Sequence, residues 1–198
     1  MQDEALWKRL RSETFFLNSG TTLAASISKF KFNAPNTFHS RRKVEQIVEE
    51  YRAFLYLAAT TQSVAVPSPL IATVWEKHQE DPRAYQATAE RIGRFVQPLP
   101  AFQGQHKDAA YEATRVAYAC EFGNPPPEKI WPSVAMQRWG YWQHKITQAL
   151  FLLCGGLFFF GYHTYLWVAL PALVVWVSAS SPTVPWNFNW SYFIGDGD

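Results

Sequence analysis

The sequence predicts an all-α protein in which a cytoplasmic helical domain is followed by a C-terminal transmembrane helical hairpin and an extended aromatic tail. Two observations carry this prediction. Amphipathic segments with capping residues fill the part of the 198-residue chain before residue 136. All 18 Lys and Arg lie at or before Lys145, and 50 residues without Asp, Glu, Lys or Arg then separate Lys145 from Asp196. The low charged fraction of 17% therefore averages a charged part and an uncharged part.

Residues 1–39 form an N-terminal segment with few regular patterns. Asp3 is a suitable N-cap for a short helix that runs through Arg11, because its side chain can accept a hydrogen bond from the first turn. From Ser26 to Phe32 apolar and polar residues alternate weakly, which predicts a short strand.

Residues 40–135 are predicted to form the helical domain. Each of its helices is indicated by a cap or by apolar residues at helical spacing. The predicted helices cover about 44–58 after Ser40, 69–79 after Ser68, Pro82 to near Gly93 after Asp81, and 106–122 before Gly123. Proline directly after Ser68 and Asp81 strengthens two of these starts, and Gly123 suits the position after a helix end.

Residues 136–181 are predicted to anchor the chain in a membrane. The run 146–179 is almost entirely apolar, too long for one span of about 20 residues and short for two. Trp and Tyr, which gather at membrane interfaces, cluster around Trp139 and Trp142, then around Trp167, then around Trp186. Three aromatic belts with two apolar runs between them indicate a hairpin that turns near 161–164. The alternative is one span near 146–166 followed by an interfacial helix kinked at Pro171.

Two features would hold this anchor in place. Gly155 and Gly156 are expected to face Ala169 and Ala172, so that the two helices approach closely. In the tail, residues 182–198, the aromatic residues alternate with polar ones and so share one face; they include Trp186, Phe188 and Trp190. Such a tail lies in the membrane interface or docks as an extended strand on a partner.

Charge predicts the orientation. No apolar run suitable for a signal peptide is visible at the N-terminus, and every Lys and Arg precedes the first predicted span. The positive-inside rule then leaves the helical domain in the cytoplasm. Cys120 and Cys154 are two cysteines on predicted helices and indicate no disulfide framework.

Arg41, Arg42 and Lys43 open the longest helix of the domain. Cations in a first turn oppose the helix dipole, and Glu45 offsets this in part. The three side chains are candidates for contact with anionic lipid head groups, with an acidic partner, or with solvent alone.

Residues 44–132 carry motifs that resemble a known family. They are Tyr51-Arg52-x-Phe54-Leu55, Pro67 before Val74-Trp75, and three prolines before Trp131-Pro132. These motifs resemble the helical domain of glycine-rich-domain-containing proteins, and in particular the bacterial membrane proteins of that group. The resemblance implies a helical domain joined to hydrophobic segments, and it places the chain in the bacterial inner membrane.

The family usually follows the tryptophan with His-x-His and has a second histidine pair after the next helix. Here the first positions are Glu76 and His78, and the second pair falls near Gln97 without histidine. Glu76 and His78 point to different faces of a helix, and His106 is the only other candidate nearby. Because a closed metal site needs about four ligands, we expect no metal and no cofactor.

Composition and motifs together favour a non-catalytic role. The net charge of +2 is too balanced for a nucleic-acid binder, and no nucleophile elbow, P-loop or dinucleotide fingerprint occurs. The prediction is an accessory subunit of a larger membrane complex, whose partners are other membrane protein subunits and the lipid bilayer. The alternatives are a membrane-anchored metal- or ligand-binding enzyme or sensor, and a peripheral lipid sensor acting through Arg41–Lys43.

Overall fold

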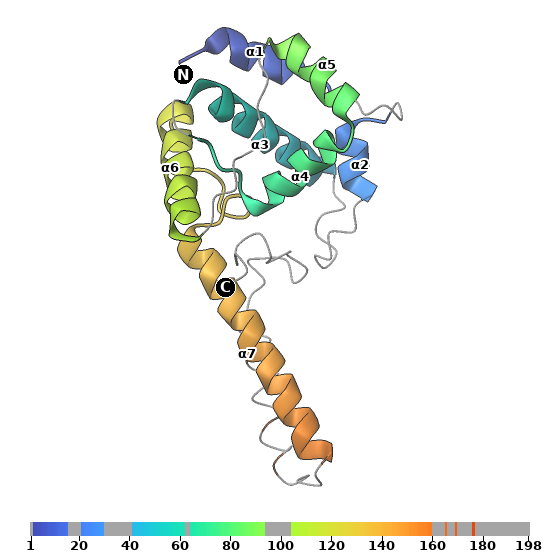
Figure 1. Ribbon diagram of the computed structural model, residues 1–198, viewed down its shortest axis with the longest axis vertical. Helices are drawn as coiled ribbons and strands as arrows, with labels where there is room; N and C mark the ends of the chain where they lie inside the picture. The colour runs from blue at the N-terminus through green and yellow to red at the C-terminus, as the bar shows by residue number, and fades with distance from the viewer. Residues whose placement is uncertain are drawn as a thin grey trace. The chain divides into compact units, whose positions relative to one another are not determined.

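The computed structural model describes residues 2–15, 21–29, 41–61, 64–93 and 104–159, together with Tyr165, Ala169 and Trp176. These residues form helices and no strand, so the expected all-α class is confirmed for them. The helices, labelled in Figure 1, are α1 (Glu4–Ser12), α2 (Leu23–Lys29), α3 (Arg41–Thr60), α4 (Pro69–Gln79), α5 (Pro82–Ile92), α6 (Gly104–Phe122) and α7 (Val134–Phe159). The chain divides into two compact units, Met1–Val134 with Asn189–Asp198, and Ala135–Phe188.

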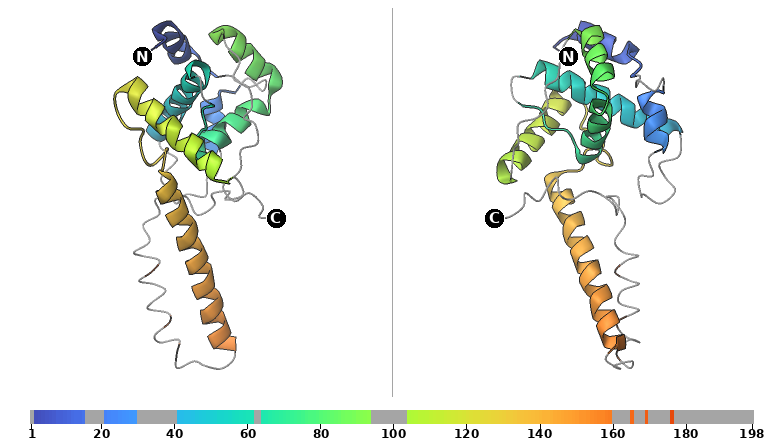
Figure 2. Two further views of the ribbon diagram at one scale, coloured as in Figure 1. Left: turned by 60° about the vertical axis from the view of Figure 1, so that its left-hand side comes forward. Right: turned by 45° about the vertical axis from the view of Figure 1, so that its right-hand side comes forward.

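Helix α3 is the centre of the first unit. Helices α1, α2, α4 and α6 all pack against it, and the two views in Figure 2 show α3 running between them. Every residue from Ala53 to Leu57 is buried, so these turns of α3 are covered on all sides rather than on one apolar stripe. Burying a large apolar side chain contributes about 1.5–3 kcal/mol, and this helix therefore organises the core.

The predicted helix boundaries of this unit follow from local capping chemistry. Asp3, Ser68 and Asp81 each accept a hydrogen bond from a backbone amide in the first turn of α1, α4 and α5, at 2.8, 3.3 and 3.1 Å. Gly93 and Gly123 follow α5 and α6 with φ of 75°, a left-handed conformation that glycine adopts without steric cost. The capping predictions at Asp3, Ser68, Asp81 and Gly123 are confirmed.

The strand predicted from Ser26 onward is wrong, because Leu23–Lys29 forms helix α2. Leu23 and Ile27, four residues apart, are both buried, and α2 packs against α3. The Thr22 hydroxyl accepts a hydrogen bond from the Ala25 amide at 3.1 Å and caps the helix. A short run can satisfy both the period of a strand and that of a helix, and here tertiary packing of the buried pair decides for the helix.

Arg52 fastens the end of α1 to α3. Its Nε donates to the carbonyl oxygen of Leu10 at 3.0 Å, and its Nη2 donates to that of Glu13 at 2.8 Å. Its Nη1 binds the Glu49 carboxylate at 3.0 Å, and its guanidinium carbon lies 5.4 Å from the centroid of the Phe15 ring. Carbonyls at a helix end lack intrahelical partners, so one side chain completes the C-terminus of α1 from outside.

The second unit contains α7 and three further described residues. Among the residues that the structure describes, no helix combines the length and the mean hydropathy that a membrane crossing needs. The predicted turn near 161–164, most of the return span and the whole tail lie outside the described residues. The transmembrane hairpin therefore stays a prediction.

Replacing Arg52 with alanine should destabilise the first unit. The variant loses two charge-assisted hydrogen bonds to backbone carbonyls, each contributing about 1.5–3 kcal/mol, and we expect a loss of about 2–4 kcal/mol. The matched control is Arg41→Ala on the same helix, where the side chain is 93% exposed and the expected loss is below about 0.5 kcal/mol. Thermal unfolding followed by circular dichroism measures both. Equal losses in the two variants would show that Arg52 does not fasten α1.

Candidate functional site

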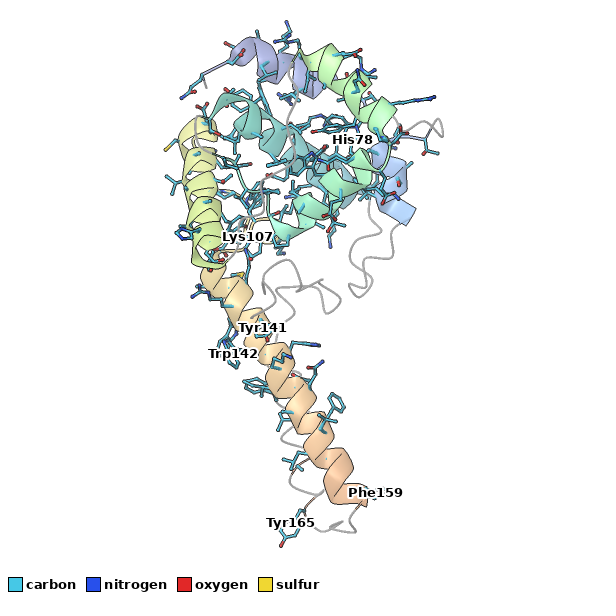
Figure 3. The ribbon with its side chains drawn as sticks, viewed as in Figure 1. His78, Lys107, Tyr141, Trp142, Phe159 and Tyr165 are labelled. Atoms are coloured by element: carbon cyan, nitrogen blue, oxygen red, sulfur yellow. The ribbon has the colours of Figure 1, made fainter. Side chains whose placement is uncertain are left out.

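Helix α7 exposes large apolar side chains along most of its length. Leu152 is 78% exposed and Phe159 is 84% exposed, and Figure 3 shows Phe159 at the far end of the helix from Trp142. The outward apolar surface, as we call it, comprises Trp139, Trp142, Ile146, Phe151, Leu152, Leu153 and Phe159. In the described part of the first unit only Val64 and Val116 are large hydrophobic residues with comparable exposure. Contiguous apolar exposure on this scale marks an interaction surface.

The opposite face of α7 is covered and contains polar residues. Thr147 and Cys154 are buried, and Gln143 and Leu150 are half-buried. These four residues, which we call the covered seam, follow one another at spacings of four, three and four residues. Such spacing keeps them on one face of a helix. A helix with hydroxyl and amide groups inside and leucine and phenylalanine outside reverses the arrangement of a helix in a soluble protein.

Trp176 lies on the covered seam. Its indole Nε1 donates a hydrogen bond to the Thr147 hydroxyl at 3.0 Å, and that hydroxyl donates to the Gln143 carbonyl at 2.8 Å. A continuous helix would separate Thr147 and Trp176 by roughly 44 Å. The hydrogen bond therefore excludes one continuous helix from Thr147 to Trp176. Sequence reading did not find this contact, because it joins residues 29 positions apart.

Gly155 and Gly156 have no close neighbour among the residues that the structure describes. Gly155 is exposed, and no described atom lies within 4 Å of a Cβ built on either glycine. Ala169 is half-buried, and Ala172 lies outside the described residues. The expected close approach of the glycines to these alanines stays a prediction.

The aromatic residues predicted for the first membrane interface lie on α7. Trp139 is 58% exposed and Trp142 is 60% exposed. The rings of Tyr141 and Trp142 meet edge to face at 5.9 Å, and the Lys145 ammonium nitrogen lies 5.6 Å from the Tyr141 ring centroid. The other predicted contact residues, namely Trp167, Trp186, Phe188 and Trp190, lie outside the described residues.

His78 belongs to the buried core of the first unit. Its Nδ1 lies 2.9 Å from the Tyr51 hydroxyl, and its Nε2 lies 3.5 Å from the Thr88 hydroxyl. The rings of Phe15 and Tyr85 meet the imidazole edge to face at 5.4 and 5.1 Å. Burial lowers the pKa of His78 to about 4, and Asp81 partly offsets this effect. The imidazole is therefore neutral at pH 7, and each of its nitrogens has a hydroxyl group as its hydrogen-bond partner.

The weak metal-ligand candidates do not form a common site. Glu76 and His106 are exposed, whereas His78 is buried. Burial and the neighbouring Glu80 raise the pKa of Glu76. No group of three or more His, Cys, Asp or Glu side chains that could hold a metal ion occurs among the described residues. In this geometry His78 stabilises the core through its two hydroxyl partners.

Glu50 is a second buried polar group, and sequence reading missed it. The Trp131 indole donates to one carboxylate oxygen at 3.0 Å, and the Tyr118 hydroxyl donates to the other at 3.3 Å. Burial raises the pKa of Glu50, while both hydrogen bonds lower it. Its position in the sequence could have predicted this burial, because Glu50 lies on the apolar face of α3 between Ile47 and Phe54. The carboxylate links α3 to α6 and to the loop that precedes α7.

The basic triplet at the start of α3 includes one cation that is paired within its own helix. The Arg41 Nε lies 2.9 Å from the Glu45 carboxylate, and the Arg41 side chain is 93% exposed. Arg42 is exposed and Lys43 is half-buried. Because Glu45 offsets Arg41, the triplet is a weaker candidate for lipid contact than its three charges indicate.

The two cysteines differ in environment. Cys120 is free and exposed on α6, whereas Cys154 is free and buried on α7. This agrees with the expectation of helix thiols.

No family model, no curated protein and no solved structure matches the chain. The resemblance drawn from residues 44–132 therefore stays a prediction.

The buried His78 should make the first unit sensitive to acid. Its pKa in the folded state is about 4, below the usual 6.5, so the folded protein binds fewer protons than the unfolded chain in this range. The stabilisation is complete above pH 6.5 and is lost as pH falls towards 4, by about 3 kcal/mol in all.

Thermal unfolding between pH 7 and pH 4 tests this expectation. His78→Phe should lose less stability on acidification than the wild-type chain, while the control His106→Phe, at an exposed position, should keep the wild-type slope. The quantity compared is the change in the free energy of unfolding with pH. Glu50, whose raised pKa favours the folded state as pH falls, contributes equally in all three proteins and cancels in this comparison. The same slope in all three proteins would contradict a buried, neutral His78.

Proposed function

We propose that this protein is a non-catalytic, membrane-anchored accessory subunit of a larger membrane protein complex. The observation that carries the proposal is the reversed polarity of α7, with an outward apolar surface and a covered seam that holds Thr147 and Gln143. Such a helix is stable where its surroundings are apolar. Lipid provides apolar surroundings, and a protein surface in contact with lipid does not need charged residues.

The anchor is a helical hairpin in this proposal. The 50 residues between Lys145 and Asp196 lack Asp, Glu, Lys and Arg, and Trp176 is hydrogen-bonded to Thr147. Both residues then lie at the same depth in the bilayer, near the interface where tryptophan is enriched. A hydrogen bond between helices in a membrane contributes about 0.6–2 kcal/mol, so this contact would help to hold the two spans together.

The helical first unit is cytoplasmic in this arrangement. Every Lys and Arg precedes Ile146, and basic residues next to a span remain on the cytoplasmic side. A hairpin returns the tail to the same side. We place the protein in a bacterial inner membrane, in agreement with the family resemblance of residues 44–132.

An accessory role fits the chemistry of the first unit. Its two most deeply buried titratable clusters, around His78 and around Glu50, consist of hydrogen bonds between helices of the fold. Each polar group there has a structural partner, which supports a scaffold that presents surfaces to other subunits. The partners in this proposal are membrane protein subunits and the bilayer, with no nucleic acid.

Charge placed on the outward apolar surface should prevent stable membrane integration. Aspartate in the middle of a span costs about 2.5–3.5 kcal/mol per residue, so Leu152→Asp with Leu153→Asp should sharply lower the carbonate-resistant membrane fraction. The control is Val64→Asp with Val116→Asp, which changes the two exposed large hydrophobics of the first unit. The control protein should stay in the membrane pellet. If wild type and both variants are all released by alkaline carbonate, the proposed anchor is wrong.

Membership of a complex is tested separately. After extraction of native membranes with a mild detergent, the chain should migrate with partner subunits in a native gel, at a mass well above 22.7 kDa plus micelle. The Trp176→Phe variant should dissociate from its partner subunits more readily, because it lacks the hydrogen bond to Thr147. A stable monomer of the wild-type chain under the mildest extraction would contradict the accessory-subunit role while leaving the membrane anchor intact.

A further inference from the structure

The first turns of α7 combine cations and aromatic rings. Arg138 and Lys145 are the only two Lys or Arg residues of the helix, which contains no Asp or Glu. Both are exposed. Trp139, Tyr141 and Trp142 lie between them in the sequence. We call these five residues the interfacial collar.

The helix geometry places both cations on one side. Seven residues correspond to nearly two complete turns, so Arg138 and Lys145 share a face and lie about 10.5 Å apart along the axis. Trp142, 60% exposed, lies within about 60° of this face. The Lys145 ammonium nitrogen is 5.6 Å from the Tyr141 ring centroid, as expected for a cation held by an aromatic face. Figure 3 shows Tyr141 and Trp142 next to each other on α7.

The same face continues into the outward apolar surface. Leu152 follows Lys145 by seven residues and is 78% exposed, and Phe159 follows Leu152 by seven residues and is 84% exposed. Along one side of α7, a segment that combines cations with aromatic rings is therefore followed by exposed leucine and phenylalanine. This is the order in which a bilayer presents phosphate, interface and acyl chain.

We propose that the interfacial collar binds the phosphate groups of anionic lipids in the cytoplasmic leaflet. The proposal rests on the proposed membrane anchor and adds the identity of the lipid that lies against it. Arg138 and Lys145 supply positive charge at two heights, and Trp142 lies between them at the level of the membrane interface, where tryptophan is enriched. The occupant is a lipid rather than an acidic protein segment, because the cations are continuous with exposed leucine and phenylalanine.

The basic triplet of the first unit provides the contrast. Arg41 is ion-paired with Glu45 of its own helix, and Arg42 is exposed. The substitutions Arg41→Gln and Arg42→Gln remove the same amount of charge as Arg138→Gln and Lys145→Gln. The pair of double variants therefore separates a local lipid site from a general effect of net charge.

Native mass spectrometry of the full chain in detergent tests the proposal. The protein is titrated with equal amounts of dioleoylphosphatidylglycerol and dioleoylphosphatidylcholine, and the ratio of the two bound lipids is measured. Each basic residue near an anionic surface strengthens binding about fivefold. The wild-type chain should prefer the anionic lipid, and the Arg138→Gln/Lys145→Gln variant should lose about 20-fold in this ratio. The exchange Arg138→Lys with Lys145→Arg should keep most of the preference.

The control Arg41→Gln/Arg42→Gln should bind the two lipids in the wild-type ratio. An equal loss in this control, or no preference in the wild-type chain, would overturn the proposal. If the double variant of the collar aggregates, the single variants Arg138→Gln and Lys145→Gln are compared, each with about a fivefold expected effect. A wild-type chain that is monodisperse without detergent overturns the membrane anchor itself, a result distinct from loss of lipid preference in a chain that needs detergent.

Discussion

Two charged side chains of α3, the buried Glu50 and the half-buried Arg52, find their partners within the protein. Glu50 faces Trp131 and Tyr118, and Arg52 faces the carbonyls at the end of α1. An unpartnered buried charge costs several kcal/mol. The two side chains therefore join α3 to the end of α1, to α6 and to the loop before α7. The apolar residues of α3 supply most of the stabilisation, and these two residues define which segments lie on each side.

Local chemistry explains what could be predicted from the sequence. The capping residues act on backbone groups within one or two turns, so a few neighbouring residues are enough to predict them. They are Asp3, Ser68, Asp81 and Gly123. Residues 26–29 were misread as strand because a seven-residue helix offers too few turns for its period to be distinguished. Leu23 and Ile27 show that packing against α3 decided the outcome there. The amphipathic pattern of the sequence also predicted one buried face for α3, whereas every residue from Ala53 to Leu57 is buried.

The interaction surfaces also contain features that the sequence predicts and features that it does not. Trp139 and Trp142 are exposed, and their role as contact residues stays a prediction that rests on the clustering of aromatic residues in the sequence. Glu50 with Trp131 and Thr147 with Trp176 join positions 81 and 29 residues apart, and no single-sequence pattern encodes such a pairing. For His78 the sequence offered only a residue type. The hydroxyl groups that surround it come from α3 and α5 and make it a core residue.

The alternating spacing of the covered seam has a consequence for how the length of α7 can change. One inserted or deleted residue rotates everything beyond it by about 100°. Such a change before Thr147 would turn Cys154 outward, and it would bring Ile146 (for an insertion) or Gln148 (for a deletion) to the position of Thr147 against Trp176. Insertions of three or four residues cause much smaller rotations, and insertions of seven almost none. The helix is thus restricted in length, and related chains should differ there in multiples of a turn.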